Sequence, residues 1–465
     1  MASITPSPFC LERLIPLPHL AVVILTAGES VRMKSKVNKV LHPLAGRPMI
    51  EYVVSVGERL SPEKPVLVVG HNAEEVQAVV GDRALYVRQN EPLGTGHAVQ
   101  QAERLLRNRA ETVLVLYGDT PLITRETLQT LVDEHWRRGA AATILTFRPP
   151  DPGHYGRIVR GRDGKVQAIV EWKEASPQIR AIREVNSGIM CFDADFLWAS
   201  LSKLQPKHGE YYLTDVVEMA VAQGRSVGAQ EADTEEVLGV NDRVELAQAE
   251  AILRRRINQQ WMLAGVTVQD PTTTYIDADV ELGQDTVIYP NTYLREATRI
   301  GPDCRIGPNT LIRDSTLGAR CEVRLSVVEG AVLEDDVDVG PFSHLRPNVY
   351  LSRGVHVGNF TELKNARLGP GTKTGHFSYL GDAQVGAEVN IGAGTVTCNY
   401  DGVRKLRTII EDGAFIGSDV MLVAPVRIGH GARIGAGAVV THDVPPNSLA
   451  YGVPARVKSE GSETT

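Results

Sequence analysis

The sequence has few cysteines and no excess of positive charge, and each shortage excludes a class of protein. Its five cysteines are far apart and form no Cys-x-x-Cys pair, so neither a disulfide framework nor a zinc site is expected. A reducing cytoplasm is the predicted location. The 49 Lys and Arg residues against 56 Asp and Glu residues give a net charge of −7. This balance argues against nucleic acid as a partner, although a few local cations suffice for small phosphorylated ligands.

Long apolar runs are also missing. The most apolar run near the start covers only residues 20–25, whereas a membrane-spanning helix needs about 18 or more apolar residues. Upstream, Pro16 and Pro18 interrupt any helix, and Glu12 and Arg13 stand where an export signal would be apolar. The sequence therefore predicts no membrane segment, and residues 1–19 are interpreted as an N-terminal extension.

The composition changes at about residue 265. A chain of 465 residues is long enough for roughly three domains. Residues 1–265 contain 19 of the 43 glycines and all four tryptophans, whereas the shorter remainder contains 24 glycines. Helical spacing of apolar residues after Asp242, which could cap a helix, ends at Gly265. We therefore expect an α/β domain over residues 20–241, a connecting helix over 242–265, a repeat domain over 266–456 and a polar tail over 457–465.

The first part alternates short apolar runs with amphipathic segments. Residues 21–25, 65–69, 112–116 and 143–147 are expected to form buried strands, and residues 49–60 and 97–107 are expected to be helical. This alternation favours a mainly parallel sheet. Ligands of such sheets bind beyond the carboxyl ends of the strands, so the loops after Leu25 and Leu116 are the places where we expect a site.

The second part contains a short repeat. An aliphatic residue followed by glycine recurs, often at intervals of six or a multiple of six, at positions 282, 300, 306, 357, 385, 391, 416, 428 and 434. A hexad period of this kind predicts a parallel β-helix, in which the aliphatic side chain points inward and glycine allows the corner. The phase breaks between Ile391 and Ile416. The polar residues 397–405 that fill this gap are a candidate functional loop.

A glycine turn follows the first predicted strand. Backbone N–H groups at Gly28 would face phosphate oxygens, and Arg32 and Lys39 would add positive charge. Asp119 follows another buried strand, where it could hold Mg²⁺ or merely cap the next turn. Gln89 and the glycine loop at residues 93–96 offer amide and hydroxyl groups that could read a base. A single glycine turn is weak evidence, but these features together favour nucleotidyl transfer.

These residues jointly resemble the sugar-nucleotide pyrophosphorylases. With the motifs at residues 210–215 and 239–241, the chain most resembles the bifunctional GlmU family, whose members make UDP-N-acetylglucosamine. The resemblance extends from about residue 20 to residue 456. It implies a Rossmann-like nucleotidyltransferase domain, a connecting helix and a left-handed parallel β-helix of hexapeptide repeats, assembled as a homotrimer that acts on small molecules.

The resemblance also implies residues for the first site. Catalytic cations would be Arg32 and Lys39, and Mg²⁺ would be held by Asp119 and Asn241. The expected contacts of UTP are Leu25, Gly28, Lys39, Gln89, Gly94 and Thr95. The expected contacts of N-acetylglucosamine 1-phosphate are Gly156, Glu171, Asn186 and Asn241.

A second site is implied within the β-helix, where acetyl-CoA would acetylate glucosamine 1-phosphate. A histidine is well suited to take the amine's proton near neutral pH, and His376 is the expected base. The sugar phosphate would be held by Arg346, Lys364 and Lys405, with Tyr379 and Asn390 orienting the sugar. Residues expected to contact the sugar or acetyl-CoA are Asn399 and Tyr400, and those expected to contact acetyl-CoA are Ala393, Ser418 and Gly435.

The sequence departs from the family pattern at three positions. Ser30 and Val31 stand where the family has glycine and threonine, and Asn38 replaces the proline before the lysine. A β-carbon at Ser30 could crowd a backbone that needs positive φ or close approach to the triphosphate. We therefore expect uridylyl transfer to be retained but slower than is usual for the family.

Two other readings are open from the sequence. The first is a single-activity nucleotidyltransferase, using UTP or dTTP, whose β-helix only builds the oligomer. The second is a regulatory subunit in which both sites have decayed. Lys39, Asp119, Asn241 and His376 count against the second reading, and the choice of sugar is the least secure expectation.

Overall fold

The computed structural model describes residues 19–28, 31–71 and 73–458. The chain divides into two compact units at Ala249 and Glu250. None of the described helices is both long and apolar enough to cross a membrane. The predicted N-terminal extension, apart from residue 19, lies outside the described residues, as does the tail after residue 458.

The first unit is built on one mixed sheet with strand order β11-β7-β10-β6-β1-β4-β5, to which β8 and β9 are added beside β10. Strands β1, β4, β5 and β6 are parallel to one another, whereas β10 runs antiparallel to both β6 and β7. The strands are β1 (Leu20–Leu25), β4 (Val66–Val69), β5 (Leu85–Arg88), β6 (Thr112–Tyr117), β7 (Ala142–Phe147), β8 (Arg157–Arg160), β9 (Val166–Val170), β10 (Val185–Asp193) and β11 (Val227–Glu231), with a hairpin of β2 (Pro43–Leu44) and β3 (Arg47–Pro48).

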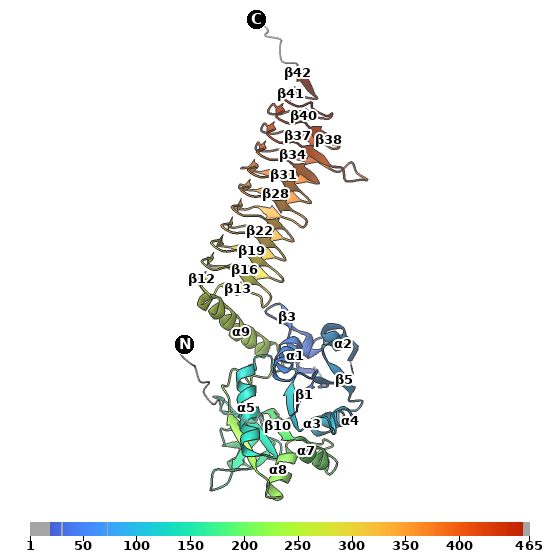
Figure 1. Cartoon of the computed structure of the whole chain (residues 1–465), viewed down its shortest axis with the longest axis vertical. Helices are drawn as coiled ribbons and strands as arrows, with labels where there is room; N and C mark the ends of the chain where they lie inside the picture. Colours follow the sequence, from blue (N-terminus) through green and yellow to red (C-terminus); the bar gives the residue numbers. More distant parts are fainter. Residues whose placement is uncertain (1–18, 29–30, 72, 459–465) are drawn as a thin grey trace, which may run out of the picture. The chain divides into compact units, whose positions relative to one another are not determined.

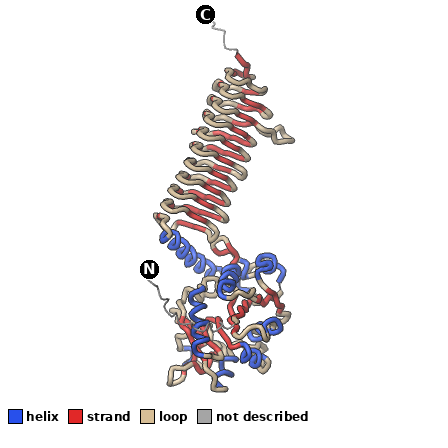
Figure 2. Tube along the Cα trace, viewed as in Figure 1, coloured by secondary structure: helices blue, strands red, loops and turns tan. Residues whose placement is uncertain are grey.

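Helices surround this sheet (Figures 1 and 2). They are α1 (Met49–Leu60), α2 (Ala73–Val80), α3 (Thr95–Gln100), α4 (Glu103–Leu106), α5 (Arg125–Arg138), α6 (Pro177–Arg180), α7 (Ala194–Leu201) and α8 (Asp215–Ala222), with short 3-10 turns η1 (Val31–Met33), η2 (Lys39–Leu41) and η3 (Gly81–Arg83). The expected helix over residues 49–60 is confirmed by α1. The expected helical segment over 97–107 is instead two short helices, α3 and α4.

The sheet is apolar on both faces because helices cover both. In β1, Ala21, Val23 and Leu25 pack into one buried cluster. The alternating residues Val22 and Ile24 pack into a second cluster on the other side. Both faces of a mainly parallel sheet are usually buried, which explains why these strands are continuously apolar in the sequence.

Helix α9 (Arg243–Leu263) spans the boundary between the units. Asp242 caps its start, because its Oδ1 accepts hydrogen bonds from the backbone N–H groups of Val244 (2.8 Å) and Glu245 (2.9 Å). Gly265 follows its end with φ of +94°, a backbone conformation that glycine adopts without strain. The sequence predicted both of these signals.

The second unit is a parallel β-helix with three faces, which Figure 2 shows as stacked short strands. Face 1 contains β12 (Thr267–Val268), β15 (Val287–Ile288), β18 (Arg305–Ile306), β21 (Glu322–Val323), β24 (Asp338–Val339), β27 (His356–Val357), β30 (Lys373–Thr374), β33 (Asn390–Ile391), β36 (Phe415–Ile416), β39 (Arg433–Ile434), β41 (Leu449–Gly452) and β42 (Ala455–Lys458), the last antiparallel to β41. Because β42 ends at Lys458, two residues of the expected polar tail belong to a strand.

Faces 2 and 3 complete each turn of the coil. Face 2 contains β13 (Thr274–Ile276), β16 (Thr292–Arg295), β19 (Thr310–Arg313), β22 (Val327–Glu329), β25 (His344–Leu345), β28 (Thr361–Lys364), β31 (Ser378–Gly381), β34 (Val396–Cys398), β37 (Met421–Val423) and β40 (Val439–Val440). Face 3 contains β14 (Glu281–Leu282), β17 (Arg299–Ile300), β20 (Thr316–Leu317), β23 (Val332–Leu333), β26 (Tyr350–Leu351), β29 (Arg367–Leu368), β32 (Ala383–Val385), β35 (Thr408–Ile410) and β38 (Val426–Ile428).

The hexad aliphatics form ladders inside the coil. Ile300 pairs with Leu317, which pairs with Leu333, and all three side chains are buried. The glycine after such an aliphatic residue is required by the next turn: a β-carbon on Gly358 would lie 1.9 Å from the carbonyl oxygen of Gly375. The residues between β34 and β35 leave the coil as a loop, which Figure 1 shows projecting from it. The loop is closed by an antiparallel bridge between Tyr400 and Lys405.

Candidate active sites

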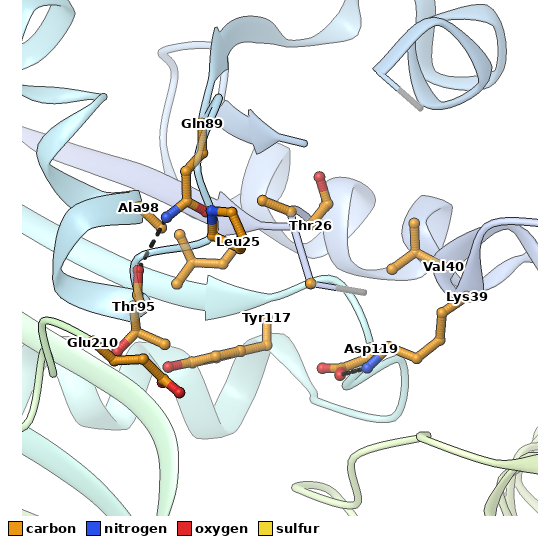
Figure 3. A pocket seen from close by; sticks show the side chains of 14 residues that line it. Leu25, Thr26, Lys39, Val40, Gln89, Thr95, Ala98, Tyr117, Asp119 and Glu210 are labelled. Atoms are coloured by element: carbon orange, nitrogen blue, oxygen red, sulfur yellow. Dashed lines mark hydrogen bonds and ion pairs between the residues drawn. The ribbon is translucent and has the colours of Figure 1, made fainter. Parts of the chain in front are cut away.

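A pocket of about 500 Å³ lies in the first unit at the carboxyl ends of β1 and β6, where the sequence predicted a site. In Figure 3, Lys39 and Asp119 lie at one side of this pocket, and Gln89 and Thr95 lie at the other. The pocket is lined by Leu25, Thr26, Ala27, Gly28, Lys39, Val40, Gln89, Pro92, Gly94, Thr95, Ala98, Tyr117, Asp119 and Glu210.

Four predicted residues converge at the Lys39 side of the pocket. The ammonium group of Lys39 pairs with the carboxylate of Asp119 and lies 3.3 Å from Oδ1 of Asn241. The guanidinium group of Arg32 donates to the same Asn241 oxygen at 2.8 Å. Two oxygen atoms from residues that are far apart in the sequence therefore face one cation. This arrangement collects the acidic and basic groups that anionic substrates and a metal ion would require.

Backbone hydrogen bonds hold Asn241 beside Asp119. The N–H of Val240 donates to the carbonyl oxygen of Asp119 at 2.8 Å, which joins the two segments directly. The N–H of Asn241 donates to Oε2 of Glu245 at 2.6 Å, in the first turn of α9. The amide side chain of Asn241 is thus fixed at a helix start, with its oxygen turned to the cations.

The opposite side of the pocket is formed by the second glycine loop. Gln89 follows β5, and its Nε2 donates to the carbonyl oxygen of Gly94 at 3.1 Å. Gly94 has φ of +95°, and a β-carbon there would lie 2.7 Å from the carbonyl oxygen of Tyr211. The Oγ1 of Thr95 accepts a hydrogen bond from the N–H of Leu213 at 3.1 Å. The motif at residues 210–215 therefore packs against this loop and shapes the pocket.

Gly156, Glu171 and Asn186 form a row across three adjacent strands. Arg157 of β8 pairs with Val170 of β9 and with Val185 of β10, and β8 runs antiparallel to both of these strands. Gly156, the residue before Arg157, is therefore level with Glu171 and Asn186, the residues after Val170 and Val185. The N–H of Asn186 donates to the carbonyl oxygen of Gly156 at 2.9 Å. On its other side, a β-carbon at Gly156 would lie 3.4 Å from a carboxylate oxygen of Glu171.

Glu171 is held in a partly buried position. Its Oε1 accepts a hydrogen bond from the hydroxyl of Thr214 at 3.0 Å. Burial raises the pKa of the Glu171 carboxyl above its usual value, and the hydrogen bond from Thr214 opposes that rise. Thr214 belongs to the motif at residues 210–215, so the row of Gly156, Glu171 and Asn186 and the glycine loop share one supporting segment.

Sequence reasoning missed Tyr117 and Tyr155. Tyr117 lines the pocket, and burial raises the pKa of its hydroxyl. Burial likewise raises the pKa of the Tyr155 hydroxyl, and the nearby backbone of Gly239 opposes that rise. Tyr117 directly precedes the Gly118 and Asp119 pair, and this position at a strand end was the available signal. No local pattern marks Tyr155.

Of the three departures from the family pattern, only Asn38 has a described side chain. Ser30 lies outside the described residues, as does the side chain of Val31. Asn38 has φ of −55°, close to the value that proline imposes, and its Oδ1 accepts a hydrogen bond from the N–H of Val40 at 3.2 Å. Asn38 therefore keeps a backbone shape that proline would have and also caps η2.

The predicted cations of the second site are brought together in the β-helix. Leu345 pairs with Leu363, which places Arg346 beside Lys364 at the end of face 2. The pKa of Lys364 is lowered, first by the neighbouring amine of Lys405 and then by the charge of Arg346. Arg346 also pairs with Glu362 at 2.9 Å, whereas Lys364 and Lys405 form no ion pair with a carboxylate among the described residues. Like charges held close together repel one another and favour an anion between them. The cluster is therefore suited to a phosphate group.

The other predicted residues lie at the turn before face 2 and around its end. His376 is exposed at that turn, two residues before the start of β31, which carries Tyr379. No described residue makes a hydrogen bond to the ring of His376, although its carbonyl oxygen accepts one from Thr361 at 3.0 Å. The Nδ2 of Asn399 donates to Asp382 at 2.6 Å. Tyr400 is exposed on the loop and donates to the carbonyl oxygen of Gly402 at 2.6 Å.

Asn390 and Gly435 are not brought beside the cation cluster. Asn390 belongs to β33 on face 1, whereas Arg346, Lys364 and Tyr379 are on face 2. The N–H of Gly435 donates to the carbonyl oxygen of Ala450 at 2.9 Å. Ala393 and Ser418 occupy the same corner of the coil as His376 on later turns. One chain thus spreads these predicted residues over two faces.

The fold and the two clusters define a nucleotidyltransferase joined to a hexapeptide-repeat transferase. Residues 22–186 match the family of MobA-like NTP transferase domains. Residues 279–323 and 407–442 match the bacterial transferase hexapeptide repeats. These matches confirm the predicted fold class.

Full-length relatives give a narrower assignment. The chain is 48% identical over 431 residues to the bifunctional protein GlmU of Shouchella clausii, covering 92% of this chain and 95% of that protein. It is 49% identical to the proteins of the same name from Exiguobacterium sibiricum and Geobacillus thermodenitrificans, covering 93% and 94% of this chain and 97% and 96% of theirs. The chain belongs to the GlmU family, as the sequence motifs predicted.

Proposed function

We propose that this chain makes UDP-N-acetylglucosamine in two reactions at two separate sites. The chain is a bifunctional enzyme, with a uridylyltransferase site in the first unit and an acetyltransferase site in the β-helix. The substrates are acetyl-CoA, UTP and the sugar 1-phosphates. The observation that carries the proposal is the convergence of Lys39, Asp119 and Asn241 at the pocket formed by β1 and β6.

In the first site, a phosphate oxygen of N-acetylglucosamine 1-phosphate attacks the α-phosphorus of UTP, and pyrophosphate leaves. The attacking group is already an anion, so the reaction needs no general base. Arg32 and Lys39 would neutralise the phosphates as charge moves to the leaving group. Five of the proposed contacts of UTP line the pocket: Leu25, Gly28, Gln89, Gly94 and Thr95. Arg32 and Asn241 lie beside the pocket and are not part of its lining. Gly156, Glu171 and Asn186 would contact the sugar.

The proposed Mg²⁺ ligands fit that metal ion in type. Asp119 and Asn241 present oxygen atoms that already face one cation, the Lys39 ammonium. Mg²⁺ commonly takes one or two protein carboxylates and completes its shell with water and substrate phosphates. No group of three or more His, Cys, Asp or Glu side chains suited to a metal occurs among the described residues. When bound, Mg²⁺ would supply positive charge between the protein and the phosphates.

In the second site, the neutral amine of glucosamine 1-phosphate attacks the thioester carbonyl of acetyl-CoA. His376 would take the proton that the amine loses, and the coenzyme A thiolate leaves. The cluster of Arg346, Lys364 and Lys405 would hold the sugar phosphate, and the lowered pKa of Lys364 supports an anion site there. Tyr379, Asn390, Asn399 and Tyr400 would orient the substrates. Ala393 and Ser418 would face acetyl-CoA; Gly435 has its N–H already donated within the coil.

We further propose that the acetyl site is completed in a homotrimer. Asn390 lies on face 1 while the cations lie on face 2, so face 1 of one copy could meet face 2 of another. The ring of His376 also lacks an orienting hydrogen bond within the described residues, which a second copy could supply. The described cysteines are free thiols, which suits a cytoplasmic enzyme.

The test separates the two activities in variants of the whole chain. Asp119→Asn should lose uridylyl transfer by at least a hundredfold while acetyl transfer persists, and His376→Ala should show the reverse. His344→Ala is a matched control, since His344 is a half-exposed histidine on the same coil that pairs with Glu329. Activity would be followed by coenzyme A release and pyrophosphate release.

A panel of UTP, dTTP and several sugar 1-phosphates, with products identified by mass, would fix the substrates. Absence of coenzyme A release from wild-type protein would favour a single-activity enzyme with a structural β-helix. Equal loss of both activities in a folded His376→Ala variant would contradict the division between the sites.

A further inference from the structure

Arg157 is a buried cation that the uridylyl reaction does not itself explain. It is the first residue of β8, directly after Gly156, and its side chain is only 1% exposed. No carboxylate among the described residues forms an ion pair with it. A buried charge without such a partner is costly unless hydrogen bonds satisfy it. The contacts of this guanidinium group therefore indicate what it holds in place.

Arg157 donates only to backbone carbonyl groups. Its Nη2 donates to Gly153 at 2.9 Å, and its Nη1 donates to Pro152 at 3.3 Å and to Tyr155. Its Nε donates to the carbonyl oxygen of Arg180, the last residue of α6, at 3.2 Å. Three of the four acceptors belong to one loop, residues 151–156. A planar guanidinium with five N–H donors can hold several carbonyls at once, whereas an ammonium group cannot match that geometry.

Trp172 forms the other side of this arrangement. The guanidinium carbon of Arg157 lies 5.0 Å from the centre of the Trp172 ring, and that of Arg180 lies 4.4 Å from it. Trp172 directly follows Glu171, one of the three residues of the sugar row. Arg157 therefore connects the loop before Gly156 with the segment after Glu171.

The loop that Arg157 holds also reaches the cation side of the site. The ring of Tyr155 packs edge-on against Phe147, with ring centres 5.0 Å apart. Its hydroxyl lies close enough to the backbone of Gly239, two residues before Asn241, for that backbone to lower the pKa of the hydroxyl. A shift of this loop would therefore move Gly156 relative to both Glu171 and Asn241.

We propose that Arg157 is a positioning residue for the sugar 1-phosphate, fixing the 151–156 loop through its carbonyl groups. The inference rests on the proposed function, because it takes Gly156, Glu171 and Asn186 as the sugar side of the uridylyl site. It predicts that substitution of Arg157 weakens binding of the sugar 1-phosphate and leaves UTP binding and acetyl transfer almost unchanged.

The test compares Arg157→Lys with Arg180→Ala in the full chain. Arg157→Lys keeps the positive charge but loses the planar guanidinium group that donates to several carbonyl groups. Arg180→Ala removes the second cation over Trp172 and its hydrogen bond to the Trp172 carbonyl oxygen (3.2 Å), and it leaves the carbonyl that Arg157 contacts. We expect Arg157→Lys to raise KM for N-acetylglucosamine 1-phosphate at least tenfold, with KM for UTP and the rate of acetyl transfer changed less than twofold. Arg180→Ala should change each of these values less than threefold.

Hydrogen exchange supplies a readout that does not depend on turnover. In Arg157→Lys the amides of residues 151–156 should exchange at least tenfold faster, while those of β1 and β6 stay protected. Unchanged KM for the sugar phosphate, or equal rises of KM for both substrates, would overturn the proposal. Loss of protection throughout the first unit would also overturn it, because Arg157 would then support the whole fold. If wild-type protein fails to use N-acetylglucosamine 1-phosphate, the proposed function fails instead.

Discussion

The Lys39 ammonium occupies the position between the two proposed metal ligands, which leads to an unusual expectation for Lys39→Met. The side chains of Lys39 and Asp119 are only 13% and 19% exposed, so water screens their pairing weakly. A hydrogen bond between charged groups contributes about 1.5–3 kcal/mol in such surroundings. A divalent cation must displace this ammonium before it can reach Asp119 and Asn241.

Removal of the ammonium should therefore strengthen metal binding to the free enzyme. Because about 1.4 kcal/mol corresponds to tenfold in affinity, Lys39→Met should bind Mn²⁺ about tenfold to a hundredfold more tightly than wild type. The same variant should be impaired in uridylyl transfer, since Lys39 is also expected to contact the UTP phosphates. Metal affinity and activity should thus change in opposite directions.

Mn²⁺ binding would be measured by electron paramagnetic resonance on the nucleotide-free protein. Lys36→Met is the matched control, because it removes an exposed lysine from the same segment and the same unit of charge. An unchanged or weaker Mn²⁺ affinity in Lys39→Met would refute the idea that the ammonium and the metal share one position. Equal gains in both variants would indicate only a general effect of charge.

Three further predictions concern single residues. Burial lowers the pKa of His135 to about 4 from 6.5, so the folded protein keeps this histidine neutral. Its contribution to stability is fully present above the unfolded pKa and is lost as the pH falls toward the folded pKa. Between about pH 7.5 and about pH 4.5 the loss should be about 2.5 kcal/mol, measured by urea unfolding, and the same slope in His135→Gln would contradict it. Asn38→Ala should be less stable than Asn38→Pro by about 0.5–1 kcal/mol in the same assay, because only proline restricts the unfolded chain; equal stabilities would count against a proline-like backbone there. Ser30→Gly should raise kcat/KM for UTP, because it removes the β-carbon that is expected to crowd this turn. An unchanged kcat/KM would contradict that expectation.

The features that the sequence predicted are those with a local or periodic signal. Ile300 and its equivalents recur because each turn of the coil buries one aliphatic side chain at the same place. Asp119 follows a strand whose continuous apolar character reflects burial on both faces of the sheet. Gly94 is marked by its neighbours in a glycine-rich loop, and its positive φ explains that composition.

The features that the sequence left unexplained depend on strand register and long connections. Gly156, Glu171 and Asn186 meet only because β8 runs antiparallel to both β9 and β10 in one particular register. Their spacing along the chain carries no period, so only the family resemblance indicated them. The contact of Asn241 with Asp119 likewise depends on a backbone hydrogen bond between distant segments.

The two sites differ in what would complete them. In the first unit the proposed polar groups already meet within one chain, since the Asp119 and Asn241 oxygens are satisfied by Lys39 and Arg32. A metal ion can take the place of these cations beside Asp119 and Asn241, and nucleotide phosphates can then pair with Lys39 and Arg32. In the β-helix, Lys405 and Arg346 lower the pKa of Lys364, and Arg346 alone of the three has an ion-pair partner among the described residues, Glu362. The proposed residues are spread over two faces. The first site therefore has its proposed groups in place within one chain, whereas we expect the second to be completed by an anion and by the surface of another copy.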